Sequence, residues 1–273
     1  MQLRSPGWRL GHRRSIHIPV RGPLLVSALL TAALLAQPAA AGDPAPSGQT
    51  ARVPVLMYHR ISCPPPDAAL PTLWICPRRF ARHMDALVAA GWRTMTARQV
   101  LWALKRGAPV PPRTFVIVID DGDRDGFDNA YPILRRRGLV ATYAVVVGRI
   151  GKRVGMTWPE LQLLISEGHE VASHTMNHDD VRRESDAGLV LEVATSAQRL
   201  QQHLGIPTRT FVYPFGLWNT RAAAAVRAAG YWGAFTTWPG CSLSWSQRLV
   251  LDRVRINGGD QPSTVLAKVR SCS

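Results

Sequence analysis

Short apolar runs alternate with amphipathic segments along most of the chain. Five runs rich in β-branched and aromatic residues have the length and composition of buried strands: 53–58 (VPVLMY), 114–119 (TFVIVI), 141–147 (ATYAVVV), 170–173 (EVAS) and 210–213 (TFVY). Apolar positions recur at helical spacing in the segments 77–91, 96–107, 128–137, 158–167, 185–204 and 219–229. Because this alternation is typical of a parallel sheet, we expect one α/β domain built as a closed or nearly closed (β/α) barrel.

The first 41 residues differ from the rest of the chain. They contain five arginines and no acidic residue, and the apolar run 24–36 is followed by Ala39, Ala40 and Ala41, the small residues typical of a signal-peptide cleavage site. This apolar run is shorter than the roughly 20 residues of a comfortable membrane span. We predict a signal peptide over 1–41, a linker over 42–52 and one domain over 53–273. We expect the protein to contact the membrane only during export.

The export route stays open at this stage. The pattern favours the general pathway, whereas Arg13-Arg14 leaves twin-arginine export as an alternative and an uncleaved anchor as a third. The expected location of the mature protein is the periplasm or the extracellular space of a bacterium, as a monomer.

Charge narrows the range of partners. Lys+Arg 33 against Asp+Glu 18 gives a formal net charge of +15, and removal of residues 1–41 leaves 28 basic residues against the same 18, an excess of +10. The basic residues are scattered and form no stripe with aromatic residues, so we predict no nucleic-acid partner. A basic surface facing anionic polymers of the cell envelope is the simpler interpretation.

Four cysteines follow the signal peptide: Cys63, Cys76, Cys241 and Cys272. An even number in an exported chain indicates disulfides, and four cysteines allow three pairings. A structural zinc site would need close pairs such as CxxC, which the sequence lacks. We favour Cys63–Cys76, which closes a proline-rich loop, and Cys241–Cys272, which holds the C-terminus.

Polar side chains follow four of the predicted strands. They are Tyr58-His59, Asp120-Asp121, His174 and Tyr213-Pro214. The carboxyl ends of the strands in a parallel α/β barrel share one rim, where active sites are built. The sequence therefore predicts that four separate segments converge on one site.

Two of these segments have the composition of a metal site. His174 and His178 can present their nitrogens to one ion from a tight loop, and Asp121 supplies a carboxylate, which leaves positions open for water and substrate. The alternatives are a solvated turn and a calcium-binding loop that begins at Asp121. The calcium loop fails because Pro132 stands where a bidentate Glu is required.

The segment 209–216 (RTFVYPFG) closes the last of the five strands. Its Gly and Pro permit an irregular backbone whose N–H groups point into the site and stabilise an oxyanion, although an aromatic turn with no such role is the alternative. No GxSxG nucleophile motif is present, and 148–153 (GRIGKR) lacks the spacing of a phosphate loop.

The motifs IDDG (119–122), HTMNH (174–178) and YPFG (213–216), in this order, resemble the first three signature motifs of the polysaccharide deacetylase family, also called the NodB-homology family or carbohydrate esterase family 4. The segments VPVLMYHRI (53–61), TWPEL (157–161) and LDRVRI (251–256) are similar to its exported bacterial branch. The resemblance implies a distorted (β/α)7 barrel that removes N- or O-acetyl groups from glycans with a divalent metal, usually Zn²⁺.

The resemblance also implies residue roles. Asp120 is then the general base, Asp121, His174 and His178 are the metal ligands, and the backbone N–H of Phe215 lines the oxyanion hole. The expected partner is an acetylated glycan polymer.

The sequence departs from the family pattern at two places. Val212 stands where the family often has Arg, and Leu251-Asp252-Arg253 replaces a late Leu-x-His motif. We predict that Arg253 takes over the pairing with the catalytic carboxylate Asp120, with Arg255 as the competing candidate.

Further residues are candidates for the substrate and the proton it needs. His59 is a candidate proton donor for the leaving amine, with a structural role as the alternative. Tyr213 and Trp238 are candidate substrate contacts, and Trp238 with Trp245 forms either a sugar-stacking wall or buried packing. His169 precedes its strand and is expected at the wrong end of the barrel.

The activity expected from the sequence is N-deacetylation of an N-acetylglucosamine-containing polysaccharide of the bacterial envelope or biofilm. O-deacetylation by the same machinery is one alternative. A carbohydrate-binding derivative without turnover is another, but it has no need for an uncoordinated carboxylate beside a metal site.

Overall fold

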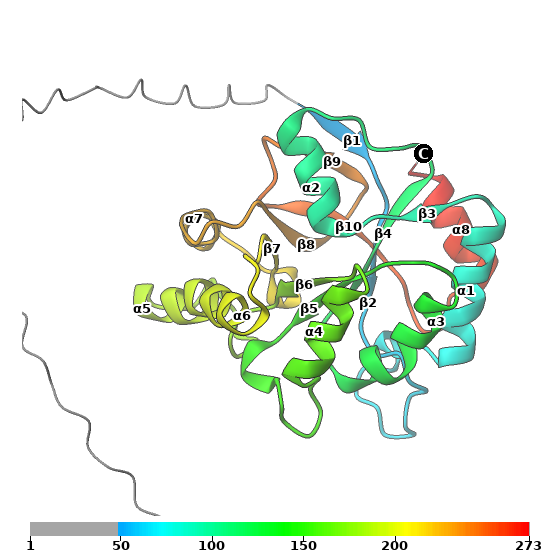
Figure 1. Ribbon diagram of the computed structural model, residues 1–273, viewed down its shortest axis with the longest axis horizontal. Helices are drawn as coiled ribbons and strands as arrows, with labels where there is room; N and C mark the ends of the chain where they lie inside the picture. Colours follow the sequence, from blue (N-terminus) through cyan, green and yellow to red (C-terminus); the bar gives the residue numbers. More distant parts are fainter. Residues whose placement is uncertain (1–48, 273) are drawn as a thin grey trace, which may run out of the picture. The chain divides into compact units, whose positions relative to one another are not determined.

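Seven parallel strands close into a barrel in the computed structural model, which describes residues 49–272 (Figure 1). The strands are β2 (Val55–Tyr58), β4 (Thr114–Ile119), β5 (Thr142–Val145), β6 (Glu170–Ser173), β7 (Thr210–Val212), β8 (Gly233–Pro239) and β10 (Leu251–Arg255). Their order is β2-β10-β8-β7-β6-β5-β4, and β2 also pairs with β4, which closes the ring. The short β3 (Arg93–Thr94) pairs with β4 outside the ring. The expected α/β barrel with seven strands is confirmed.

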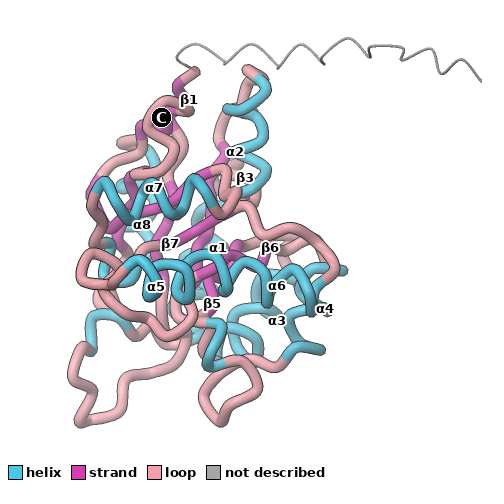
Figure 2. The backbone as a smooth tube through the Cα atoms, turned by 90° about the vertical axis from the view of Figure 1, so that its left-hand side faces the viewer, coloured by secondary structure: helices cyan, strands magenta, loops and turns pink. Residues whose placement is uncertain are grey.

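Helices surround the barrel and lie outside the strands (Figure 2). They are α1 (Pro77–Ala89), α2 (Ala97–Arg106), α3 (Tyr131–Arg135), α4 (Trp158–Ser166), α5 (Asp186–Leu189), α6 (Ser196–Leu204), α7 (Thr220–Ala228) and α8 (Pro262–Arg270). Thr96 and Gln99 form the capping box of α2 that their spacing indicates. The long helix expected over 185–204 contains a π-helical stretch, Val190–Thr195, between α5 and α6. Among residues 49–272, no helix is long and apolar enough to cross a membrane.

Each face of the central strands packs against a different part of the core. Phe115, Ile117 and Ile119 of β4 belong to the cluster shared with α1, α3 and α4, whereas Val116 and Val118 belong to the cluster that α2 joins. Alternate strand residues point to opposite faces, so a strand buried on both faces consists of apolar residues without alternation. This explains why TFVIVI gives the plainest strand signal in the sequence.

Some elements were not predicted from the sequence. The strand β1 (Thr50–Arg52), which lies within the expected linker 42–52, pairs antiparallel with β9 (Ser242–Ser244). The signal peptide and residues 42–48 lie outside the described part of the chain. The strand β8 carries Gly, two Thr and Pro among its aromatic residues, and α8 is short, so neither shows strong periodicity.

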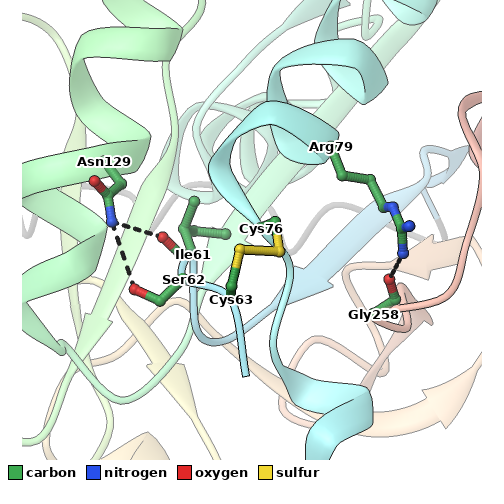
Figure 3. The surroundings of a disulfide bond; sticks show 7 residues. All are labelled: Ile61, Ser62, Cys63, Cys76, Arg79, Asn129 and Gly258. Atoms are coloured by element: carbon green, nitrogen blue, oxygen red, sulfur yellow. Dashed lines mark hydrogen bonds between the residues drawn. A yellow bond between two sulfur atoms is a disulfide. The ribbon is translucent and has the colours of Figure 1, made fainter. Parts of the chain in front are cut away.

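Both expected disulfides are present. Cys63–Cys76 joins the segment after β2 to the start of α1 (Figure 3), and Cys241–Cys272 joins the loop before β9 to the turn that follows α8. Near the first disulfide, the side-chain amide of Asn129 donates to the carbonyl oxygen of Ile61 at 2.8 Å. The proline-rich loop between Cys63 and Cys76 is therefore held to the barrel at both ends.

We expect the Cys241–Cys272 disulfide to contribute strongly to stability. The cysteines are 31 residues apart, and in the chain-entropy model a loop of that length stabilises the folded protein by on the order of 3–4 kcal/mol. Cys241→Ser with Cys272→Ser should lower the free energy of unfolding in urea by about this amount. If the free energy of unfolding of the double variant is within about 0.5 kcal/mol of the wild-type value, the cross-link does not stabilise the protein by restricting the conformations of the unfolded chain.

Candidate active site

The loops that follow the strands gather at one end of the barrel and enclose a cavity. The loop after β2 and the loop after β5 lie at the lower end in Figure 1, whereas β1 and β9 lie at the upper end. The cavity has a volume of about 460 Å³. Its lining includes His59, Asp120, Asp121, His174, His178, Tyr213 and Phe215. Side chains from all four predicted segments therefore meet in one place.

Asp121, His174 and His178 form a compact cluster of potential metal ligands. Their ligand atoms all lie within 4.8 Å of one another, and Asp121 Oδ1 is 3.3 Å from His178 Nε2 and 3.7 Å from His174 Nε2. Nδ1 of His174 is 2.7 Å from the carbonyl oxygen of Val212. Because a carbonyl only accepts, Nδ1 carries the hydrogen and Nε2 presents its lone pair to the cluster.

Electrostatics keep His178 in the form that binds metals. Burial lowers its pKa to about 4, and the neighbouring His174 acts in the same direction. A neutral imidazole is the form that ligates a cation, so His178 is ready for a metal at neutral pH without losing a proton.

Asp120 and Arg253 form a buried ion pair beside this cluster. Asp120 is 2% exposed and Arg253 is 1% exposed. One nitrogen, Nη1 of Arg253, donates to both carboxylate oxygens at 2.9 and 2.8 Å, while Nε donates to the carbonyl oxygen of Thr236 at 2.6 Å. The pairing matches the expectation, but a single nitrogen makes both bonds in place of two parallel N–H groups, and Nε binds Thr236 instead.

The charges around Asp120 set its ionisation. Burial, the largest single influence, raises the pKa of this carboxyl, but the charge and hydrogen bond of Arg253 together with the charges of His59 and His174 outweigh burial, and the pKa of Asp120 lies below its usual value of 3.8. Asp120 is therefore an ionised carboxylate at neutral pH. Arg255, the competing candidate for this pairing, is exposed and lines the cavity instead.

Backbone strain is concentrated at the site. Five non-glycine residues among those described have positive φ, and four of them lie here: Asp121 (φ 73°), Thr175 (φ 70°), His178 (φ 73°) and Phe215 (φ 58°). Such conformations cost of order 1–3 kcal/mol each and persist where the surrounding structure holds them. Gly122 follows with φ 71°, and a Cβ there would lie 2.9 Å from the Cα of Val145. The turn after β4 thus needs glycine to bring both carboxylates to the cavity.

The turn after β7 presents Phe215 to the cavity. Phe215 is 58% exposed, and its ring packs edge to face against His178 with centroids 4.7 Å apart. The N–H groups of Gly216 and Leu217 donate to the carbonyl oxygens of Tyr213 and Pro214. A Cβ at Gly216 would clash with Thr237, so glycine fixes this tight turn.

Tyr213 and His59 line the cavity from two further strands. The hydroxyl of Tyr213 is buried without a hydrogen-bond partner among the described residues. His59 Nε2 lies 3.7 Å from Asp120 Oδ2, and burial lowers the pKa of His59, although Asp120 opposes that shift. His59 is therefore a polar group beside the catalytic carboxylate, whereas the ring of Tyr213 packs edge to face against Phe211 with centroids 5.1 Å apart.

The other aromatic and histidine candidates lie elsewhere. Trp238 is 51% exposed, outside the cavity lining, and packs edge to face with Trp218 at 5.6 Å. Trp245 packs against the core cluster that includes α2, so it builds no wall with Trp238. His169 accepts from the N–H of Ala141 before β5 and lies at the opposite end of the strands, as expected.

Two features of the cavity were missed from the sequence. Arg149 lines it from the 3₁₀ turn Val147–Arg149 after β5, and Leu70, Thr72 and Leu73 form a wall on the loop closed by the first disulfide. No short motif marks either one. The position of Arg149 directly after a predicted strand was the available signal.

The acidic residues of the rejected calcium loop have a structural role. Arg60 donates to Asp123 at 2.7 Å and to Asp125 at 2.9 Å, and its guanidinium lies 4.5 Å from the ring centroid of Trp74. These contacts fasten the loop after β2 to the turn after β4.

Known proteins resemble this chain in sequence and in structure. The family model described as polysaccharide deacetylase matches residues 107–234. The chain is 27% identical over 221 residues to a Bacillus subtilis protein named as a polysaccharide deacetylase, YxkH, covering 81% of this chain and 77% of that protein. It is 26% identical over 166 residues to the poly-β-1,6-N-acetyl-D-glucosamine N-deacetylase of Staphylococcus aureus, covering 56% of this chain and 57% of the relative. The Streptococcus pyogenes deacetylase PplD, solved in complex with acetate, has a TM-score of 0.75 at 26% identity and covers 80% of this chain and 97% of that chain.

The fold and the cavity define a (β/α)7 barrel with a candidate active site, and the relatives support a hydrolase activity. Residues 107–234 match the polysaccharide deacetylase family model, and the proteins that the chain resembles over most of its length are named as deacetylases. The matched segment 107–234 contains the IDDG, HTMNH and YPFG motifs, and Arg253 lies beyond it.

Proposed function

We propose that the protein is a metal-dependent N-deacetylase of an N-acetylglucosamine-containing polysaccharide outside the cytoplasm. The observation that carries this proposal is an ionised, buried carboxylate, Asp120, beside a separate set of potential metal ligands in one cavity. The relative from Staphylococcus aureus supports N-acetyl rather than O-acetyl groups as the target. Two disulfides support an oxidising compartment.

The donor set fits a divalent metal, and Zn²⁺ is the ion we propose. Asp121, His174 and His178 offer one carboxylate and two imidazoles, a combination that zinc takes in catalytic sites with positions left open. A metal held there would polarise the acetyl carbonyl and lower the pKa of a bound water towards ~7.

The chain's own groups then supply the base and the oxyanion contact. Asp120 accepts the proton of the attacking water, which adds to the acetyl carbonyl and gives a tetrahedral oxyanion. The N–H of Phe215, on the strained turn after β7, donates to that oxyanion. Collapse breaks the bond to nitrogen and yields acetate and a free amine.

The leaving nitrogen needs a proton, and His59 is the candidate donor. Its Nε2 lies 3.7 Å from the carboxylate that has just accepted a proton, and it lines the same cavity. Because the pKa of His59 is lowered by burial, the imidazole starts neutral and receives the proton from Asp120 before passing it to the amine.

The direct test is release of acetate from a panel of acetylated polymers. The panel contains β-1,6-linked poly-N-acetylglucosamine, chitin oligosaccharides, peptidoglycan and acetylated xylan. We expect acetate from at least one of the polymers with N-acetyl groups. Acetate from xylan alone would establish the O-deacetylase instead, and acetate from none would leave a carbohydrate-binding protein.

We expect one divalent metal per chain, measured by elemental analysis of the purified protein. His174→Ala and His178→Ala each remove one ligand, so bound metal should fall by about tenfold or more at limiting metal concentration. His169→Ala is the matched control because this histidine lies at the other end of the strands. Full metal content in both ligand variants would show that the metal site is elsewhere.

A further inference from the structure

Two arginines face the cavity from opposite sides of the barrel. Arg255 lies on β10, two residues beyond Arg253, so both are on the same face of the strand. Arg149 ends the turn after β5. In the ring of strands, β10 and β5 are separated by β2 and β4 in one direction and by β8, β7 and β6 in the other. Both arginines line the catalytic cavity, one on each side.

Neither of these two guanidinium groups is held by a side chain of the described residues. Among residues 49–272, neither side chain has an ion-pair or hydrogen-bond partner within bonding distance. The charge of Arg149 acts on Asp123, where it helps to lower a pKa that burial raises, but Arg60 is the side chain that binds this carboxylate, at 2.7 Å. Arg149 and Arg255 are therefore available to a ligand.

The charges that line the cavity do not cancel. Asp120 is neutralised by Arg253, which leaves Asp121 as the remaining carboxylate against Arg149 and Arg255. The side chains alone thus give the cavity an excess of positive charge, before any metal is counted. A cleft with one sign of charge concentrates ligands of the opposite sign.

Binding of a neutral glycan does not require two arginines at the cavity. Their hydroxyl and amide groups do not need a guanidinium, whereas carboxylates and phosphates match its planar set of donors. A cavity of about 460 Å³ is within the range for small-molecule sites, so we expect the neighbouring sugars of a polymer to extend past it, beside the arginines that line it.

We propose that the polymer deacetylated here is an anionic glycan that carries a carboxylate or a phosphodiester on the sugars flanking the acetylated one. Arg255 contacts the anionic group on one side and Arg149 the group on the other. This inference rests on the proposed deacetylase function and names the substrate class of the same site. The excess of ten positive charges over residues 42–273 also attracts an anionic polymer, over a longer range than the two arginines do.

The test compares tetrasaccharides that differ in charge. The neutral probes are β-1,4- and β-1,6-linked tetra-N-acetylglucosamine. The anionic probes are a peptidoglycan tetrasaccharide, which carries carboxylates, and an N-acetylglucosamine oligomer joined by phosphodiesters. For the metal-loaded wild type we expect kcat/KM at least about tenfold higher with one anionic probe than with either neutral probe, mainly through KM, and a decrease of this preference with added salt. The anionic probe that is preferred identifies the source of the charge.

Substitutions assign the preference to the two arginines. Arg149→Ala and Arg255→Ala should each lower the ratio of anionic to neutral kcat/KM about fivefold or more, and the double variant should lower it further. Arg255→Lys should restore part of the ratio because it keeps the charge but loses the planar donors. Arg199→Ala, an exposed arginine on α6 outside the cavity, is the matched control and should leave the ratio as in the wild type.

Binding is measured separately from turnover. Calorimetry with the Asp120→Asn variant reports the affinity for each tetrasaccharide without hydrolysis, and the same arginine substitutions are made in that background. Equal affinity for neutral and anionic probes, or a ratio that neither arginine substitution changes, would overturn the anionic-substrate proposal. Absence of acetate from every polymer would overturn the deacetylase proposal instead, and the binding comparison would still decide the role of the arginines.

Discussion

Asp120→Asn is expected to lower kcat by about 10³-fold or more while the protein keeps its metal. The substitution removes a base but no ligand, since Asp120 pairs with Arg253 and lies outside the cluster of Asp121, His174 and His178. An amide oxygen still accepts a hydrogen bond from Arg253, so the buried guanidinium is not left without a partner. Acetate release and metal content are measured on the same preparation.

The neighbouring Asp121→Asn is the control for this result. Asp121 Oδ1 lies 3.3 Å from His178 Nε2 and belongs to the ligand cluster, so its loss should reduce both metal content and turnover. Excess metal should restore part of the activity of Asp121→Asn and none of the activity of Asp120→Asn. The division of roles between the adjacent carboxylates is wrong if the two variants lose metal to the same extent.

Much of the site was predictable because strand ends are visible in the sequence. Asp120, His174 and Tyr213 each follow an apolar run, and the parallel topology brings such positions to one rim whatever their separation along the chain. The pairing of Arg253 with Asp120 was predictable for the same reason, once Val212 was seen to leave a buried carboxylate without a cation.

What could not be predicted depends on tertiary context. The bonding pattern of Arg253 follows from the carbonyl of Thr236 on β8, a strand whose mixture of Gly, Thr and Pro gave no periodicity. The cavity wall that includes Leu70 and Leu73 lies on a loop whose path is set by a disulfide and by Arg60 rather than by local propensity. The N–H of Gly148 donates to the carbonyl oxygen of Met176, and this bond joins two distant loops and fixes the position of the adjacent Arg149.

Arg253→Ala is expected to lower kcat by about 10²-fold and to move the acidic limb of the pH–rate profile to higher pH. Asp120 works as a base only when ionised, so activity is lost as the pH falls through its pKa. In the wild type, burial raises that pKa, but Arg253, as the largest opposing influence, helps His59 and His174 to hold it below its usual value. Without the guanidinium, His59 and His174 oppose burial alone, the pKa of Asp120 rises, and activity is lost at a higher pH than in the wild type. Bound metal should be unchanged, because Arg253 touches no ligand.

The pH profile separates this role from a purely structural one. Loss of Arg253 leaves a buried carboxylate unpaired, which destabilises folded proteins by about 3–5 kcal/mol, so reduced activity alone would also follow from partial unfolding. Unfolding reduces the amount of active enzyme at every pH, whereas loss of the ion pair moves the limb. Arg253→Lys should bring the limb part of the way back, since an ammonium restores the charge near Asp120 but not the bond from Nε to Thr236. Arg255 lies on the same strand without contact to Asp120, so Arg255→Ala should leave the acidic limb in place. If the acidic limb also stays in place in Arg253→Ala, the guanidinium does not set the ionisation of the base.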